Sequence, residues 1–368
     1  MGRRGGSGSL SAAKVLAAFL AAFVAVHPPL KLWVPWAAES FVASIIGRPW
    51  GWRQHRWQPL AAALVPPTPV NTINATELAA GATVDLTRPL LVRDAATAEA
   101  LELFSVEALQ RPPLGDVVID YFVDATRSGH LVPDGRARLG DVVRNITLGA
   151  PHKIGSQYVV SRHGCCPDRS KRAKTLEALL PRALARAFGG ERRFSTTALD
   201  LSLLTVPLFV AGTPVGARPR TDLHSEPIAS VAVQLRGSKR WTLVDAAASA
   251  VVRPRPSGDG PHAGVESIFS DVVAATPRLD AGRAYFRSSL HDSEVDRIAG
   301  RYEVETTAGD MLYVPPWTWH AVAYDSAAVA VAASLFHFVP SSFVRNQPAF
   351  AVAILPNLAK ELVGVKTQ

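Results

Sequence analysis

The sequence predicts a mainly β fold, an antiparallel sandwich or barrel, which carries an α/β extension on its N-terminal side. Two stretches predict the β part. Residues 230–244 contain two short strand patterns around Gly237-Ser238, and residues 301–338 contain strand patterns separated by turn residues. Closely spaced strands with turns between them are typical of sandwiches and barrels. The helical patterns come mostly before this part, so we expect the helices to flank the β core.

The composition is that of a folded protein with a large core. The chain has 368 residues, of which 48% are hydrophobic and 19% are charged, so widespread disorder is not expected. The net charge is +8, and basic residues are densest in 161–174 and 181–193. Nucleic-acid surfaces interleave aromatic with basic side chains, and only Phe188 lies among these. We expect a solvated loop and a helix with a basic face there, and no nucleic-acid partner.

Four stretches before the β core predict single elements, in this order: a strand at 85–96, a helix at 95–111, a strand at 116–124 and an amphipathic helix at 174–189. Pro181 interrupts the last helix, because proline lacks the backbone N–H that a helix interior needs. Gly189 closes it, since glycine tolerates the conformation that ends a helix.

The β core is predicted to begin with a β-hairpin at 230–244, whose turn is Gly237-Ser238. The strands of 301–338 follow, with turns at Gly309-Asp310, Pro315-Pro316 and Asp325-Ser326. No internal repeat is visible. A single barrel core is therefore expected.

The first 36 residues have the features of a targeting segment. Basic residues precede an apolar run from Val15 to Val26, which has the length of a signal-peptide core and is too short to span a bilayer alone. If the helix continues to Trp36, the segment is a signal anchor and the rest of the chain is luminal. An organelle transit peptide is the alternative, because this region contains no acid before His27. Residues 37–70, rich in tryptophan and proline, are predicted as a linker.

Two sequons, at Asn74 and Asn145, are glycosylation acceptors if the chain enters the secretory pathway. Together with the leader they favour a protein of the secretory lumen or a single-pass membrane protein of the endoplasmic reticulum or Golgi.

The two cysteines, Cys165 and Cys166, are adjacent. Neighbouring cysteines form a disulfide only through an eight-membered ring, so we expect free thiols rather than a stapled framework. A redox-sensitive element and an intermolecular link are the alternatives. The chain contains no Cys-x-x-Cys zinc pattern.

Two motifs together predict a metal site. The first, "TDLHSEP" (221–227), places His224 and Glu226 two positions apart, and a strand points such residues to one face. The second, "AGDMLYVPPWTWHAV" (308–322), ends a strand at two prolines and then delivers His320 at the start of the next strand. Two histidines and one carboxylate on a barrel would form a facial triad, which leaves three positions open for a cosubstrate and O2.

These motifs, in this order and with "GSKRW" (237–241) between them, resemble the Jumonji C, cupin-like 2-oxoglutarate oxygenases. The resemblance runs from about Arg88 to Phe338 and is strongest in 221–244 and 304–322. It implies a double-stranded β-helix whose first barrel strand lies in 88–96. The domains expected are an N-terminal α/β part, a core barrel with the metal site, and a C-terminal helical tail, at 71–200, 201–345 and 346–368.

The resemblance also assigns roles to six residues. His224, Glu226 and His320 are the expected Fe(II) ligands. Thr221 and Lys239 match the family's partners of the distal carboxylate of 2-oxoglutarate, and Ser334 falls near an asparagine that contacts this cosubstrate in many members. The carboxylate ligand is aspartate in many members, but some Jumonji demethylases use glutamate, so Glu226 is compatible with a working site. Trp241, Trp317 and Trp319 are expected to pack the barrel.

The implied function is that of a 2-oxoglutarate-dependent dioxygenase, which couples oxidative decarboxylation of 2-oxoglutarate to hydroxylation of a protein side chain. A demethylase is less favoured, because a luminal enzyme does not meet chromatin. One alternative is a catalytically silent, membrane-anchored cupin-like domain that binds a partner or a sugar; retention of Thr221, Lys239 and both histidines argues against it. Another is a Zn or Mn enzyme without 2-oxoglutarate, against which Lys239 also argues.

Overall fold

The computed structural model describes residues 60–123, 133–201, 203–212, 220–249, 251–252, 254–256, 286–288, 290–324 and 329–346. All of them belong to one compact unit, Leu60–Gln368. The predicted targeting segment, the first part of the predicted linker and the predicted C-terminal tail beyond Asn346 lie outside the described residues. None of the helices in the described part has the length and apolarity that crossing a bilayer requires.

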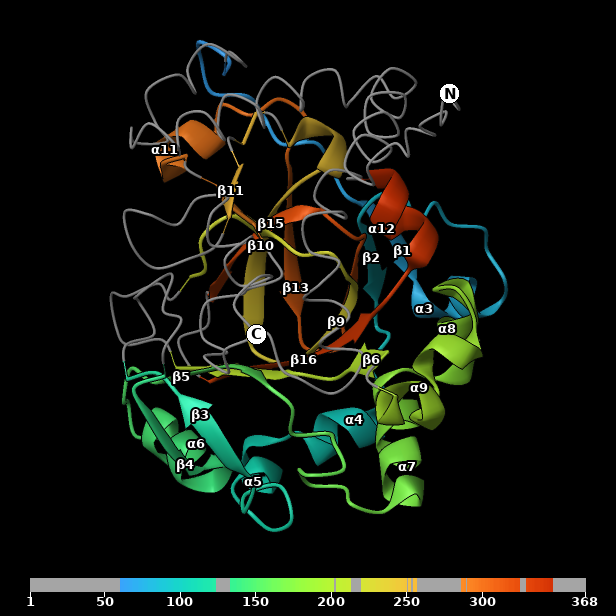
Figure 1. Cartoon of the computed structure of the whole chain (residues 1–368), viewed down its shortest axis with the longest axis vertical. Coiled ribbons are helices and arrows are strands. Elements are labelled where there is room, and N and C mark those ends of the chain that lie inside the picture. Colours follow the sequence, from blue (N-terminus) through green and yellow to red (C-terminus); the bar gives the residue numbers. More distant parts are fainter. Residues whose placement is uncertain are drawn as a thin grey trace, which may run out of the picture. The chain divides into compact units, whose positions relative to one another are not determined.

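Two sheets form the core (Figure 1). The eight-stranded sheet has the order β1 (Asn71–Asn74), β2 (Leu90–Arg93), β14 (Met311–Val314), β9 (Ala229–Arg236), β16 (Ala330–His337), β7 (Leu208–Ala211) and β5 (Lys153–Gln157), with β6 (Leu204–Thr205) also paired to β16. The six-stranded sheet has the order β11 (Pro254–Pro256), β12 (Phe286–Ser288), β8 (His224–Ser225), β15 (Trp319–Tyr324), β10 (Ser238–Val244) and β13 (Tyr302–Thr307). All pairs are antiparallel except β1 with β2.

The chain crosses from one sheet to the other at almost every turn of the core. Strands β7, β9, β14 and β16 lie in one sheet, and β8, β10, β13 and β15 lie in the other; the chain changes sheet at each step of this series except between β10 and β13. This alternation is that of a jelly roll, or double-stranded β-helix, so the predicted fold class is confirmed.

The hairpin predicted at 230–244 is wrong. Strands β9 and β10 do not pair: β9 lies between β14 and β16, and β10 lies between β13 and β15. Gly237, with φ +67°, turns the chain from one sheet into the other. Glycine takes up this left-handed conformation without strain, which explains why the signal resembled that of a hairpin turn.

An apolar layer fills the space between the sheets. The six-stranded sheet contributes Trp241, Leu243, Tyr302, Val304 and Val322, and the eight-stranded sheet contributes Leu91, Ala232, Leu312 and Val314. The three tryptophans predicted to pack the barrel are all buried, Trp317 and Trp319 completely. Apolar side chains thus fill the barrel interior beside the strands that carry the metal motifs.

Helices cover the outer face of the eight-stranded sheet. They are α3 (Ala75–Ala79), α4 (Ala98–Leu103), α5 (Val106–Leu109), α6 (Leu139–Thr147), α7 (Arg169–Leu179), α8 (Arg182–Ala187), η2 (Glu191–Phe194) and α9 (Thr196–Asp200). Phe104, Leu179 and Phe188 from these helices share one buried cluster with Val231 and Val331 of the sheet. A small sheet of β3 (Val118–Tyr121) and β4 (Gly135–Arg138) lies beside α6 (Figure 1). Three short helices, η3 (Ala246–Ala248), α11 (Asp292–Val295) and α12 (Pro340–Asn346), lie within the core sequence.

The predicted elements before the core are present with shifted boundaries. Strand β2 pairs with β14, so the stretch at 88–96 does supply a barrel strand. The helix predicted at 95–111 is two helices, because Ser105 ends one and caps the next by accepting from the N–H of Ala108. The predicted interruption at Pro181 separates α7 from α8, and Gly189, with φ +108°, follows the end of α8.

The expectation of free thiols is wrong, because Cys165 and Cys166 are joined in a disulfide. Both side chains are buried, and the N–H of Cys165 donates to the carbonyl of Val159. The disulfide thus follows directly after a tight turn, in which the N–H of Gly164 donates to the carbonyl of Ser161. Sequence spacing gave no sign of this turn.

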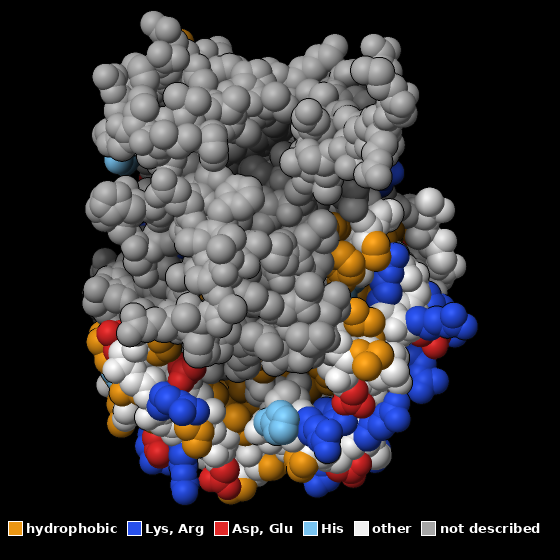
Figure 2. Space-filling model, viewed as in Figure 1, with side chains coloured by type: hydrophobic (Ala, Val, Ile, Leu, Met, Phe, Trp, Pro, Cys, Tyr) orange, Lys and Arg blue, Asp and Glu red, His pale blue; other side chains and the backbone are white. Residues whose placement is uncertain are grey.

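Basic side chains gather on the flank that carries α7 and α8 (Figure 2). Arg169, Lys171 and Lys174 are exposed, but they lie in α7, where a solvated loop was predicted. Arg172 differs, because it is buried and donates to the carbonyls of Cys166 and Pro167 and to Asp200. One arginine of this face thus fixes the cysteine turn against the helices.

The described end of the predicted linker, residues 60–70, is bound to the barrel. The N–H of Val65 donates to the carbonyl of Asp296, and Thr68 forms a parallel bridge with Tyr302. The buried Arg301 side chain donates to the carbonyl of Val65. This segment therefore lies against β13, the edge strand of the six-stranded sheet.

Candidate metal centre

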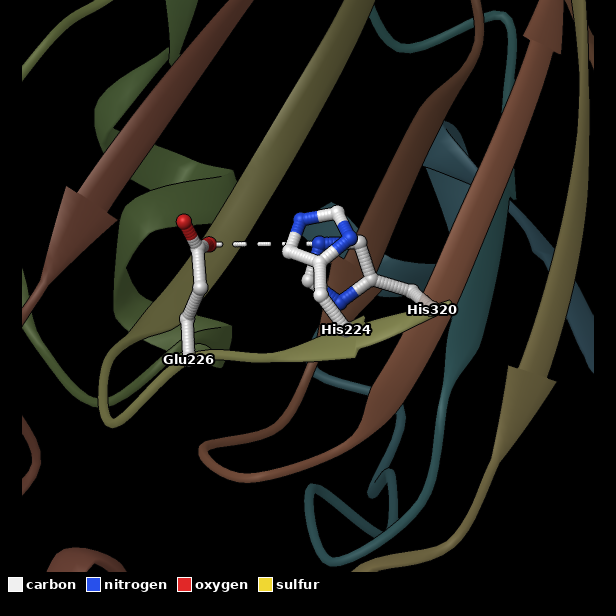
Figure 3. A group of neighbouring side chains, drawn as sticks. All are labelled: His224, Glu226 and His320. Carbon is white, nitrogen blue, oxygen red and sulfur yellow. Dashed lines mark ion pairs between the residues drawn. The ribbon is translucent and has the colours of Figure 1, made fainter. Parts of the chain in front are cut away.

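The three predicted metal ligands lie together on neighbouring strands (Figure 3). His224 is on β8, Glu226 follows directly after this strand, and His320 is the second residue of β15. His224 and His320 are directly opposite each other in the antiparallel register, with ring centroids 4.2 Å apart. The Nε2 atom of His320 lies 3.9 Å from Oε2 of Glu226. The predicted i, i+2 arrangement thus brings both side chains of the first motif to the histidine of the second.

The backbone around the ligands is held by the segment that connects β14 to β15. Ser225, completely buried between the two ligands of the first motif, donates its hydroxyl to the carbonyl of Trp317, and the N–H of Trp317 donates to the carbonyl of Glu226. Trp317 has φ +66°, an uncommon conformation for a bulky residue. Its indole N–H donates to the carbonyl of Phe343, so hydrogen bonds hold Trp317 in this conformation. A strained backbone conformation that the surrounding contacts maintain is a feature of functional sites.

Each histidine is oriented by a carbonyl two residues before it. Nδ1 of His224 lies 2.7 Å from the carbonyl oxygen of Asp222, and Nδ1 of His320 lies 3.1 Å from that of Thr318. A carbonyl oxygen only accepts, so both Nδ1 atoms carry the proton and the lone pair is on Nε2. Metal-binding histidines commonly donate the other ring N–H to a carbonyl in this way, which fixes the ring and presents the ligand nitrogen.

The environment keeps both rings neutral. Burial lowers the pKa of His224 to about 4, and burial together with the neighbouring His224 lowers the pKa of His320 to about 3. Neutral imidazole is the form that binds a metal ion, because the protonated ring has no lone pair. Near neutral pH the two rings are therefore ready to bind.

The donor set fits a metal ion that prefers nitrogen and oxygen ligands. One ligand atom from each of the three residues lies within 4.8 Å of the others. Two ligands at about 2.1 Å from one ion are at most about 4.2 Å apart, so a small approach of the side chains suffices. Two histidines and one carboxylate, grouped on one side, are the donor set of a facial triad.

Lys239 lies deep in the same barrel. Along β15, His320, Val322 and Tyr324 point to one face, and their partners on β10 are Leu243, Trp241 and Lys239. The lysine is only 3% exposed, and burial lowers its pKa to about 7. Among the residues that the structure describes, no carboxylate lies within ion-pair distance of its ammonium group. A buried cation without a partner is costly, so the site favours an anion at this position.

The other two predicted cosubstrate residues are each paired with a residue of the interior layer. The hydroxyl of Thr221 accepts from the N–H of Val322, which leaves the hydroxyl proton for a second partner. Ser334 is buried on β16 opposite Ala232, a residue of the interior layer. The structure thus brings all six predicted site residues into one barrel, with the lysine farther along it than the triad.

Sequence reasoning missed four residues around this site, namely Asp222, Arg287, Phe209 and Tyr324. Arg287, on β12 directly opposite His224, lies 3.9 Å from the carboxylate of Asp222, whose carbonyl orients His224. Phe209 and Tyr324 place their rings beside the ammonium group of Lys239. The period of two along β15 from His320 could have placed Tyr324 inside. Arg287 and Phe209 had no local signal, since each comes from a strand distant in the sequence.

Fold and site together define a double-stranded β-helix with a candidate two-histidine, one-carboxylate metal centre in its interior. Residues 169–338 match the family model of the cupin-like domain, so this part of the chain is similar to that family. Strands β2 and β5, which precede the matched range, belong to the same eight-stranded sheet. No curated protein sequence matches the chain.

Proposed function

We propose that this protein is an Fe(II)- and 2-oxoglutarate-dependent oxygenase that hydroxylates a side chain of a protein substrate. The observation that carries the proposal is the presence, inside one barrel, of the triad His224, Glu226 and His320 together with the buried side chain of Lys239, which has no carboxylate partner among the described residues. A metal-binding cupin that does not use a dicarboxylate has no need for this cation.

Different residues would bind the two ends of the cosubstrate. The triad would hold Fe(II) on one side and leave the opposite positions open. Lys239 would bind the distal carboxylate, a fixed ion pair that supports orientation as well as affinity. When bound, iron and 2-oxoglutarate would supply the oxidising chemistry with O2 as the oxidant: 2-oxoglutarate is decarboxylated to succinate and CO2, and one oxygen atom of O2 enters succinate while the other enters a C–H bond of the substrate.

Buried tryptophans brace the backbone beside the triad. Trp317 and Trp319 are completely buried, and the indole N–H of Trp319 donates to the hydroxyl of Ser249. The carbonyls of Asp222 and Thr318 hold both imidazoles in the orientation that presents Nε2.

The test is turnover of 2-oxoglutarate by the purified protein with Fe(II) and ascorbate, measured as succinate. We expect turnover and a thermal stabilisation by 2-oxoglutarate in the wild type, and neither in His224→Ala. The exposed His163 provides the matched control, since His163→Ala removes an imidazole far from the triad in sequence and should keep both signals. Absence of both signals in the wild type would overturn the proposal and favour a silent binding domain.

The compartment is a second part of the proposal. Asn74 and Asn145 are both exposed, so both sequons are accessible to the glycosylation machinery. We propose a luminal domain, in which the substrate is a protein of the secretory pathway. Endoglycosidase treatment of the chain expressed in secretory cells should increase its mobility on a gel, and Asn74→Gln with Asn145→Gln should abolish this shift. An unshifted wild-type band would contradict the luminal placement.

A further inference from the structure

The turn between β14 and β15 contains a large side chain at a position whose backbone favours glycine. Trp317 has φ +66°, and its side chain is completely buried. In this left-handed region the Cβ atom of an L-residue crowds the following carbonyl oxygen, and glycine avoids this cost because it has no Cβ. A bulky residue persists in such a conformation only where the surrounding contacts hold it. The indole side chain must therefore make contacts that a glycine could not.

These contacts link the turn to the C-terminal helix α12, which begins soon after β16 ends. The indole N–H of Trp317 donates to the carbonyl oxygen of Phe343 at 2.8 Å, and the two rings stack with centroids 5.7 Å apart. The side-chain amide of Asn346 donates to the carbonyl oxygen of Pro316 at 3.2 Å. Phe343 is only 2% exposed, so the helix is packed firmly at this point. Two hydrogen bonds and one ring contact thus fasten the turn to α12.

The backbone of Trp317 in turn holds the segment that carries the carboxylate ligand. Its N–H donates to the carbonyl oxygen of Glu226 at 2.7 Å, and its carbonyl oxygen accepts from the hydroxyl of the buried Ser225 at 2.9 Å. Both histidines of the triad lie within paired strands, opposite each other in the register of β8 with β15. Glu226 follows the end of β8 and has no such ladder partner among the described strands. The position of this ligand therefore depends on the turn rather than on the sheet.

We propose that Trp317 is a positioning residue for the metal ligand Glu226, and that α12 is the element that keeps it in place. The link runs from Phe343 and Asn346 on the helix to the turn, and from the backbone of Trp317 to the carbonyl of Glu226. A glycine would take up the same backbone conformation with less strain, but it would lose the connection to the helix. The inference rests on the metal centre of the proposed function, and it does not depend on the cosubstrate or on the reaction.

Titration of the full chain with Mn(II), followed by electron paramagnetic resonance, measures the metal centre apart from turnover. We expect Trp317→Gly, which relieves the backbone and removes the link, to weaken Mn(II) binding about 10–100-fold, the range found for residues that orient metal ligands. Trp317→Phe keeps a ring to stack on Phe343 and loses the indole hydrogen bond, so the loss should be smaller. Asn346→Ala should weaken binding in the same direction although Trp317 is unchanged.

Thr97→Val is the control that separates positioning from stability. The hydroxyl of Thr97 accepts from the N–H of Ala100 and donates to the carbonyl of Ala178, in the helical layer outside the barrel. Loss of these bonds should lower the midpoint of urea unfolding and leave the affinity for Mn(II) and its spectrum at the wild-type values. If Trp317 were merely structural, its variants would show this same pattern.

The outcomes distinguish the inference from the proposed function. If Trp317→Gly, or Trp317→Phe together with Asn346→Ala, binds Mn(II) as tightly as the wild type, the link to α12 does not position the ligand and the inference is overturned, while the oxygenase proposal stands. If Trp317→Gly does not fold, weakened binding in the other two variants carries the inference. If the variants weaken Mn(II) binding but the wild type does not turn over 2-oxoglutarate, the inference stands and the oxygenase proposal is overturned. A wild type that does not bind Mn(II) overturns both.

Discussion

His224 and His320 face each other across β8 and β15 with ring centroids 4.2 Å apart, and each donates its Nδ1–H to the carbonyl two residues before it. The same local geometry on two strands directs both Nε2 atoms toward the region where Glu226 lies. The metal centre is thus a property of strand pairing: the register of β8 with β15 decides that the two motifs meet.

Glu226 should be required for metal binding through its charge. We expect Glu226→Gln, which keeps the size but removes the anion, to weaken Mn(II) binding more than about 100-fold, since outer-shell partners alone contribute about 10–100-fold. Glu226→Asp keeps the carboxylate with a shorter reach and should bind more tightly than Glu226→Gln. Mn(II) titration followed by electron paramagnetic resonance checks the order. Equal affinities for the two variants would show that this carboxylate is not a ligand.

Lys239→Met should have opposite effects on binding and on stability. It removes the partner of the anion, so 2-oxoglutarate binding should be lost. It also removes a buried cation that lacks a carboxylate within the described structure, so the free energy of unfolding near pH 7 should rise, by about 1–4 kcal/mol. Urea denaturation of the metal-free proteins measures this gain. A destabilised variant would mean that the ammonium group already has a strong partner.

The gain from Lys239→Met should also depend on pH. Burial lowers the pKa of Lys239 from 10.5 to about 7, so between these values the unfolded chain binds a proton that the folded chain does not. Wild-type stability therefore rises with pH across this window, and the advantage of the variant is greatest below pH 7 and shrinks toward pH 10.5. A constant difference between pH 7 and pH 9.5 would contradict the lowered pKa.

His337 should make the protein sensitive to acid. This histidine is 1% exposed, its Nε2 has no hydrogen-bond partner in the described structure, and its ring packs 4.6 Å from that of Phe194. Burial lowers its pKa to about 4, so stability is lost as pH falls from 6.5 through 4. Between pH 7.5 and pH 5, His337→Phe should remove roughly 2 kcal/mol of this loss, because about 1.5 pH units lie between 6.5 and 5 and each corresponds to about 1.4 kcal/mol.

Urea midpoints of chelated wild type and His337→Phe at pH 7.5 and pH 5 check this, because the triad histidines contribute equally to both proteins. The exposed His163 is the control, and His163→Ala should show the wild-type dependence on pH. If His337→Phe loses as much stability on acidification as the wild type, His337 is not a source of the sensitivity.

Gly237 should be required for the crossing between the sheets. Its φ of +67° costs a residue with a Cβ about 1–2 kcal/mol, so Gly237→Ala should lower the free energy of unfolding by about this amount. Gly237→Asn should cost less, since asparagine tolerates the left-handed region. Thermal denaturation of the three proteins checks this ranking. If the main effect of alanine were to reduce the flexibility of the unfolded chain, Gly237→Ala would be more stable than the wild type, and the prediction would be wrong.

The sequence by itself determined the parts that depend on local pattern. The strand runs of 301–338, the turn at Gly309, the helix break at Pro181 and the i, i+2 pair His224 and Glu226 all follow from period, turn chemistry or strand geometry, which act over a few residues. Linking the two motifs into one triad needed the resemblance to a family, since no local rule connects positions so far apart.

Tertiary structure decided which strands pair and what surrounds each side chain. The pattern around Gly237 could not show that β9 and β10 enter different sheets, because a left-handed glycine serves both a hairpin and a crossing. Nor could spacing show that Cys165 and Cys166 are joined, or that Tyr324 and Phe209 flank Lys239. These relationships depend on contacts between distant segments, and such contacts exist only when the two sheets close around a common interior.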